Sequence, residues 1–182
     1  MELLSHVVEL PLSGTPFGEM LDLCLVLVLV TWLLSVLTRE YSWVDRIWSI
    51  APAVYVDYVA WSESFADPRL NIMALLVTLW GVRLTWNFAR KGGYGLGGED
   101  YRWLELRKKL GPFGFQVFNA TFIAPYQGVL LWLFSAPVHT AWQHKATPLG
   151  VLDMVAAGAF FVLLIGETVA DEQMWRFQQE KK

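Results

Sequence analysis

Long apolar blocks, separated by short charged loops, are the feature that most constrains the fold of this 182-residue chain. Hydrophobic residues make up 55% of the sequence and charged residues 17%, below the quarter that is usual in soluble domains. The block Met20–Thr38 is about as long as a helix must be to cross a bilayer. The pattern predicts an all-α fold, a polytopic membrane helix bundle that forms a single domain over residues 1–182.

These blocks predict five membrane helices. The second is short and contains Asp57, which could relay protons or lie near the luminal surface. The fourth contains Pro125 and Pro137, which predict a kink or a re-entrant segment. The helical pattern of the fifth continues toward Lys182. The expected helices are Met20–Thr38, Ile47–Trp61, Leu70–Phe88, Phe113–Trp142 and Leu149–Val169.

The distribution of Lys and Arg predicts how the bundle sits in the membrane. Eleven of the 14 basic residues fall on one side of the five helices, two fall on the other side, and Arg83 lies within a helix. The positive-inside rule therefore places the loops 39–46 and 89–112 and the C-terminus in the cytoplasm, and the N-terminus in the lumen or outside. The net charge of -3 argues against nucleic-acid binding.

A polar stripe on the third helix is the first candidate site. Trp80, Arg83, Asn87 and Arg90 recur at spacings that place them on one helix face. Arginine is costly in hydrocarbon unless it faces a bundle interior or a water-filled cavity. The stripe could bind an anionic group such as a cofactor phosphate, or Arg83 could pair with an acid on a neighbouring helix.

The glycine-rich loop over residues 92–103 is the second candidate, with Glu99, Asp100 and Arg102 in it. Glycine amides can approach a ligand closely and form an anion-binding nest. No strand precedes the loop, so it is neither a Walker motif nor a dinucleotide fingerprint. The alternative is a flexible connection followed by an interfacial helix, Tyr101–Leu110. Physical argument alone leaves both interpretations open.

Two further helices carry polar side chains at membrane depth. Asn119 belongs to a stripe with Gln116, and buried amides need hydrogen-bond partners from other helices or from a ligand. Glu167 and Asp171 form an i, i+4 acidic pair, which predicts a compensating cation such as Arg83, a ligand donor or a raised pKa. Elsewhere, Asp45 is expected to cap the second helix.

The histidines and the single cysteine do not suggest metal or redox chemistry. His6, His139 and His144 are scattered without metal-ligand spacing, so no metal site is predicted. Cys24 lies in an apolar run and is expected to be buried.

Several short motifs, in order along the chain, resemble a family of mostly uncharacterised membrane proteins similar to steroid 5-alpha-reductases. The resemblance covers about Tyr41 to Gln178. The matching segments are residues 44–49, 80–85, 90–94, 98–103, 115–119, 126–127 and 167–171.

The resemblance implies the first five helices of a seven-helix reductase fold in an endomembrane such as the endoplasmic reticulum. NADPH would bind from the cytoplasm and a lipid-like or sterol-like enone would enter from the bilayer. Hydride would pass from the nicotinamide to the β carbon of the double bond while a protein acid polarises the carbonyl. The residues assigned to cofactor binding are Arg83, Asn87, Glu99, Asp100, Arg102, Asn119, Glu167 and Asp171.

The sequence also departs from that family. It ends at Lys182 without a motif like Ser-Arg-His-Pro-Asn-Tyr-x-Gly-Glu, which supplies much of the nucleotide contact in the family. The chain is therefore expected to be incomplete at its C-terminus and inactive by itself. The alternatives are a noncatalytic membrane protein that binds lipid or acts as a scaffold, and a membrane methyltransferase that uses S-adenosylmethionine.

Overall fold

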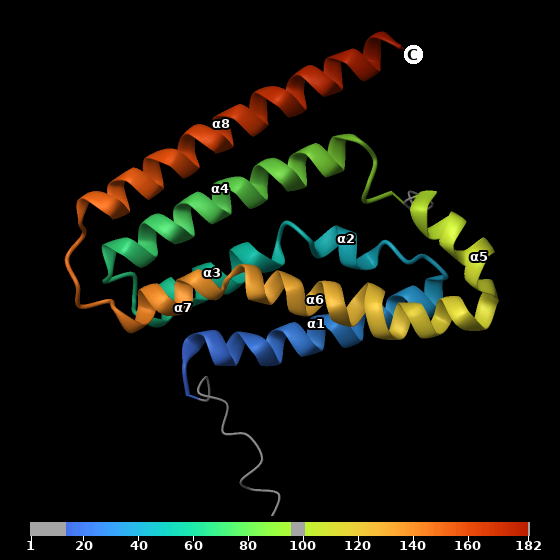
Figure 1. The fold of residues 1–182 in the computed structure, drawn as a ribbon, viewed down its shortest axis with the longest axis horizontal. Coiled ribbons are helices and arrows are strands. Elements are labelled where there is room, and N and C mark those ends of the chain that lie inside the picture. Colours follow the sequence, from blue (N-terminus) through green and yellow to red (C-terminus); the bar gives the residue numbers. More distant parts are fainter. Residues whose placement is uncertain (1–13, 96–100, 182) are drawn as a thin grey trace, which may run out of the picture.

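The computed structural model describes residues 14–95 and 101–181, and this part of the chain is helical without a strand (Figure 1). The all-α fold that the sequence predicts is therefore confirmed. In chain order the elements are α1 (Pro16–Thr38), α2 (Trp43–Ile47), α3 (Ala51–Ser62), α4 (Pro68–Arg90), α5 (Tyr101–Phe118), the π-helix η1 (Asn119–Ile123), α6 (Ala124–Phe134), α7 (Ala136–Gln143) and α8 (Val151–Glu180).

Four helical stretches in the described residues are long and apolar enough to cross a membrane, which confirms a polytopic membrane bundle. They correspond to the first, third, fourth and fifth predicted helices. Local start signals set two of them. The Thr15 hydroxyl accepts the Gly18 N–H at 3.1 Å ahead of α1, and the Asp67 carboxylate accepts the Leu70 N–H at 2.9 Å ahead of α4. The four stretches are Pro16–Thr38, Pro68–Arg90, Arg102–Gln143 and Val151–Glu180.

The prediction of one continuous second helix over Ile47–Trp61 is wrong. The structure divides this segment into α2 and the 12-residue α3, with turns between them. Pro52 lies in the first turn of α3, where its missing N–H and its ring are tolerated. A helix running through Pro52 would place the ring against the carbonyl of Trp48, so the helix restarts at Ala51.

The fourth predicted helix is interrupted, as its prolines indicate. The five residues of η1 adopt the π conformation just before Pro125, and Ser135 separates α6 from α7 just before Pro137. A further break at Gly111, whose φ is +69°, separates the first part of α5 from the second. Figure 1 shows the first part of α5 turned across the end of the bundle. Of the two arrangements that the prolines predict, a kink or a re-entrant segment, the structure has the kinked helix.

The core lies among α1, α3, α6 and α7. Phe17 of α1 stacks on Trp132 of α6, with ring centroids 4.5 Å apart. A β carbon on Gly128 would lie 2.3 Å from the Val28 side chain, so α1 and α6 approach closely at this glycine. Cys24 is fully buried beside it, as expected. The helix α4 packs on α3, and α8 lies outermost, along α4 (Figure 1).

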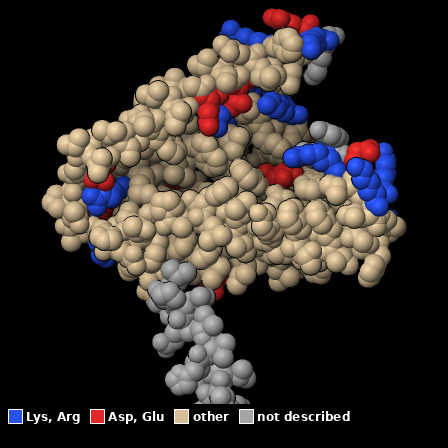
Figure 2. Space-filling model, in the orientation of Figure 1, with Lys and Arg blue, Asp and Glu red and all other residues tan. Residues whose placement is uncertain are grey.

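Basic side chains gather at one end of the bundle. This end holds the C-terminal ends of α1, α4 and α8 together with α2 and α5 (Figure 1). Figure 2 shows blue groups clustered there around a hollow, and few at the opposite end. We call it the basic end; which face of a membrane it meets stays a prediction.

Candidate functional site

Helix α4 is the element that organises the polar groups, because two of its faces carry them toward different neighbours. Thr78, Gly81 and Thr85 meet α3 and the turn before it. Arg69, Arg83 and Arg90 lie at seven-residue multiples on a largely opposite face and meet α8 and the segment before it. We call the row of contacts between these arginines and α8 the arginine seam.

The centre of the arginine seam unites three of the predicted site residues. Arg83 bonds Glu167 through Nη2 at 2.7 Å and Asp171 through Nη1. Its side chain is only 15% exposed, so the guanidinium lies within the helix pair rather than in solvent. Of the alternatives for Arg83, pairing with acids of a neighbouring helix is the arrangement in the structure. It also supplies the compensating cation predicted for the acidic pair.

The next contact along the seam includes Asn87. Arg90 donates from Nε to Asn87 Oδ1 at 3.0 Å, bonds Glu172 through Nη1 at 2.7 Å and donates from Nη2 to the Asp171 carbonyl at 3.0 Å. Its guanidinium carbon also lies 5.0 Å from the centre of the Trp175 ring. Four of the eight predicted residues, Arg83, Asn87, Glu167 and Asp171, thus come together in this seam.

The far end of the seam was not predicted. Arg69 bonds Asp153 through Nε and Nη2 at 2.7 and 2.9 Å, and it also donates to the carbonyls of His144 and Pro148. Arg69 and Asp153 are 84 residues apart, as are Arg83 and Glu167. The two helices therefore run parallel and in register. The seven-residue spacing of the arginines was a visible signal for this seam.

A second polar feature is a cavity of about 520 Å³ at the basic end, which we call the end cavity. Cations line it from two sides, Lys91 after α4 and Arg102 on α5, opposite Asp45 of α2. The Trp103 indole donates to the Asp45 carboxylate at 3.3 Å. The remaining lining consists of hydroxyl, amide, glycine and apolar groups: Ser42, Trp48, Ser49, Leu84, Phe88, Gly93 and Gln127.

Arg46 holds the wall of the end cavity in place. It is 7% exposed, pairs with Glu40 at 2.8 Å and donates to the carbonyls of Gly93 and Gly95. A β carbon on Gly93 would lie 2.4 Å from the Phe88 ring, so a larger residue here would displace this ring from the cavity wall. The start of the glycine-rich loop is thereby tied to α2.

The other predicted site residues lie elsewhere. Asn119 is fully buried in η1 and donates to the Ser35 hydroxyl of α1 at 2.8 Å, so it stabilises helix packing away from the seam. Arg102 belongs to the end cavity, while Glu99 and Asp100 lie outside the described residues. The expected capping role of Asp45 is wrong, because α2 already begins at Trp43 and Asp45 lies inside it.

The sequence comparisons place this chain in a family. Residues 31–182 match the model of DUF1295, described as a protein of unknown function. The chain belongs to this family. It is also 35% identical over 173 residues to uncharacterized protein C594.04c of Schizosaccharomyces pombe (strain 972 / ATCC 24843). That match covers 93% of the chain and 50% of the yeast protein, so the chain spans about half the length of this relative. No solved structure gives a significant match.

Proposed function

We propose that this chain forms the cofactor-binding end of a membrane reductase that uses NADPH to reduce a lipid-like or sterol-like enone. The observation that carries the proposal is the end cavity. It brings together Asp45, Lys91, Gly93, Arg102 and Gln127, which come from separate segments of the sequence. Its volume of about 520 Å³ falls in the range of ordinary ligand sites.

The lining of the end cavity suits a phosphorylated nucleotide. Lys91 and Arg102 offer positive charge for phosphate groups, and a 2′-phosphate is what distinguishes NADPH from NADH. Trp48 and Phe88 offer aromatic surface against which a base or a nicotinamide ring could stack. NADPH, when bound, would supply the hydride, and the residues of this chain would hold it at the membrane surface.

An apolar cavity supports the choice of a lipid-soluble substrate. About 260 Å³ lies between α3, α4, α6 and α8, with Trp80, Phe160 and Leu163 among its walls. Glu167 also lines this cavity while it is bonded to Arg83. Glu167 is thus a polar group in the wall of the cavity, beside which the polar end of an enone would lie, while Arg83 would hold Glu167 in position.

The first experiment measures NADPH binding by the purified chain in nanodiscs, with tryptophan fluorescence as the signal. We expect saturable quenching by NADPH and weaker binding of NADH. Arg102→Ala should weaken NADPH binding about tenfold, as for the loss of a charge-assisted contact. Lys108→Ala is the matched control, because Lys108 is an exposed cation of the same helix that pairs with Glu105 and does not line the cavity.

Failure of NADPH to bind a folded sample would contradict the proposal for this chain. It would favour a noncatalytic lipid-binding protein, the function that the apolar cavity by itself supports. Binding of S-adenosylmethionine in place of NADPH would instead favour a methyltransferase. If NADPH binds, oxidation of NADPH in the presence of a panel of lipid enones tests the reaction itself.

A further inference from the structure

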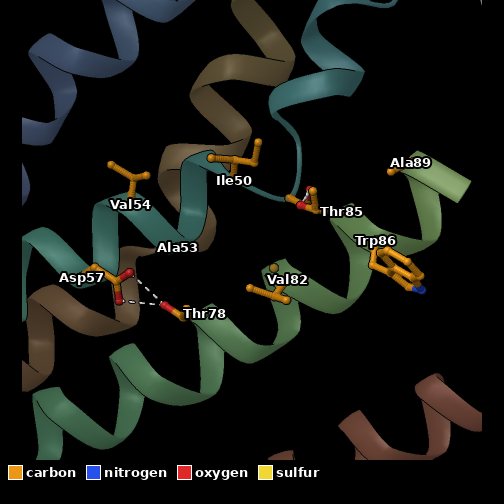
Figure 3. A pocket seen from close by; sticks show the side chains of 11 residues that line it. Ile50, Ala53, Val54, Asp57, Thr78, Val82, Thr85, Trp86 and Ala89 are labelled. Atoms are coloured by element: carbon orange, nitrogen blue, oxygen red, sulfur yellow. Dashed lines mark hydrogen bonds between the residues drawn. The ribbon is translucent and has the colours of Figure 1, made fainter. Parts of the chain in front are cut away.

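Asp57 of α3 is an acidic residue that the arginine seam and the end cavity do not use. Both of its carboxylate oxygens lie near the Thr78 hydroxyl of α4, at 2.9 and 2.8 Å (Figure 3). A hydroxyl has one hydrogen, so it can satisfy only part of the hydrogen-bonding capacity of a carboxyl group. Asp57 therefore keeps acceptor capacity for another partner.

The partner that Asp57 lacks is a cation. Within residues 14–95 and 101–181, no Lys, Arg or His forms an ion pair with it, whereas Asp153, Glu167, Asp171 and Glu172 of α8 are each paired with an arginine. Asp57 pairs with Thr78, which lies near the middle of the membrane-crossing helix α4. A carboxyl group at such depth is expensive and is a functional-site hypothesis by default.

The space beside Asp57 is a groove of about 420 Å³ between α3 and α4. Ile50, Val54, Val82 and Trp86 form its apolar walls, and Figure 3 shows Asp57 and Trp86 at opposite ends of it. Val82 and Trp86 are 62% and 67% exposed, so the groove opens sideways, toward the lipid of a surrounding bilayer. We call it the Asp57 groove.

Other polar groups of the groove are already satisfied by each other. The hydroxyls of Ser49 and Thr85 lie 2.7 Å apart and share a hydrogen bond. Among the described residues that line the groove, Asp57 is the one with an ionisable side chain. The groove thus offers an apolar channel with a single acidic end, and a complementary ligand has an apolar body and a single basic end.

We propose that the Asp57 groove binds a lipid-soluble primary amine, with the amino group on the Asp57 carboxyl and the hydrocarbon chain along α3 and α4 toward Trp86. The pair carries no net charge whether the proton sits on the nitrogen or on the carboxyl, so binding leaves no uncompensated charge in the membrane. Thr78 and Trp86 are eight residues apart on α4, about 12 Å, which suits a medium-length alkyl chain. This proposal is independent of NADPH binding, because the groove and the end cavity share only Ser49.

The experiment uses the chain in nanodiscs of zwitterionic lipid, with dodecylamine brominated at the far end of its chain as the probe. Bromine quenches tryptophan at short range, so Trp86 reports a chain that lies in the groove. We expect saturable quenching that Trp86→Phe largely removes. Dodecanol with the same bromine is the matched ligand, and we expect it to bind at least about tenfold more weakly, because it cannot replace the missing cation.

Two variants test the role of the carboxyl. Asp57→Asn keeps the shape of the side chain and should abolish the preference for the amine over the alcohol. Thr78→Val removes the hydroxyl and leaves the carboxyl, so the amine should bind at least as tightly as to the unchanged protein. Equal binding of amine and alcohol to the unchanged protein would overturn the proposal, and so would unchanged amine affinity in a folded Asp57→Asn variant. Quenching that never saturates would show simple partitioning into the bilayer and would also overturn it.

Discussion

The face of α4 that meets α3 is uncharged and comes very close to its neighbour at Gly81, whereas the face that meets α8 carries three arginines. At the first contact, a β carbon on Gly81 would lie 2.6 Å from the backbone oxygen of Ser49 and 3.4 Å from the side chain of Ala53. At the second contact, Arg69, Arg83 and Arg90 reach across to α8. One helix therefore uses two different means of association within the same bundle.

The difference reflects the two kinds of interaction that hold helices together in a membrane. Lipid solvates apolar side chains as favourably as a protein interior does. Helices therefore associate through small residues that permit close approach, or through polar bonds. The contact with α3 follows a short turn and combines close approach at Gly81 with hydrogen bonds made by Thr78 and Thr85. The contact with α8 has three separate points of attachment, which makes it tolerant of the loss of any single one.

The largest expected effect comes from breaking the close contact. Gly81→Leu should destabilise the protein by about 1–3 kcal/mol, because the new side chain meets backbone that cannot move aside easily. Thermal unfolding in detergent measures the effect. Gly158→Leu on α8 is the control, since nothing lies within 4 Å of its β-carbon position, and it should change the midpoint little. Equal effects of the two substitutions would contradict the packing described here.

A smaller effect is expected from the arginine seam. Arg83→Gln leaves Glu167 and Asp171 without their cation and should weaken the docking of α8 by about 1–2 kcal/mol, since Glu167 is about half exposed. Docking is measured by crosslinking cysteines placed at Leu76 and Phe160, which share the 84-residue offset of the seam. We expect slower crosslinking in the Arg83→Gln variant.

Two controls make the crosslinking specific to the seam. Arg176→Gln should leave the rate unchanged, because Arg176 pairs with Glu172 within α8 and is 74% exposed. Moving the second cysteine from Phe160 to Val162 should abolish crosslinking, since Val162 lies on another face of α8. Crosslinking of both cysteine pairs at one rate would show that the register is wrong.

The smallest effect is expected at the connection opposite the basic end. A hydrogen bond from Lys145 and, to a smaller extent, one from Trp142 hold the pKa of Glu63 below its ordinary value. This carboxylate therefore stabilises the fold at neutral pH, and the contribution is lost as the pH falls from about 4.3 through the lowered pKa. Glu63→Gln should reduce the free energy of unfolding by less than about 1 kcal/mol at pH 6, and the difference should shrink as the pH falls through the lowered pKa of Glu63. A difference between the two proteins that stays constant as the pH is lowered would contradict this assignment.

Much of the fold could be predicted because membrane helices are long and apolar. The positions of α1, α4 and α8 follow directly from the apolar blocks. The break before α3 was missed because the segment 47–56 is apolar apart from Ser49, and Pro52 marks a helix start there rather than a bend. The apolar pattern by itself does not distinguish these two roles of proline.

The sites could be predicted only in part, for a similar reason. The i, i+4 spacing of Glu167 and Asp171 predicted a compensating cation, a ligand donor or a raised pKa, and Arg83 was the cation named as a candidate. The lining of the end cavity comes from four helices and the loop that follows α4, so no spacing within one segment of the sequence predicts it. Asn119 is as polar as the residues of the arginine seam, and only its position in the fold separates it from them.

The spacing of the outer arginines has a consequence for the membrane that suits this protein. Arg69 and Arg90 are 21 residues apart on one continuous helix, which corresponds to about 31 Å along its axis. That length matches the hydrocarbon thickness of an ordinary bilayer, about 30 Å. Both guanidinium groups can therefore reach the two polar boundaries at once when α4 stands nearly upright, whereas a markedly thinner membrane requires the helix to tilt. The stretch of α4 between these two arginines therefore suits a bilayer of ordinary thickness.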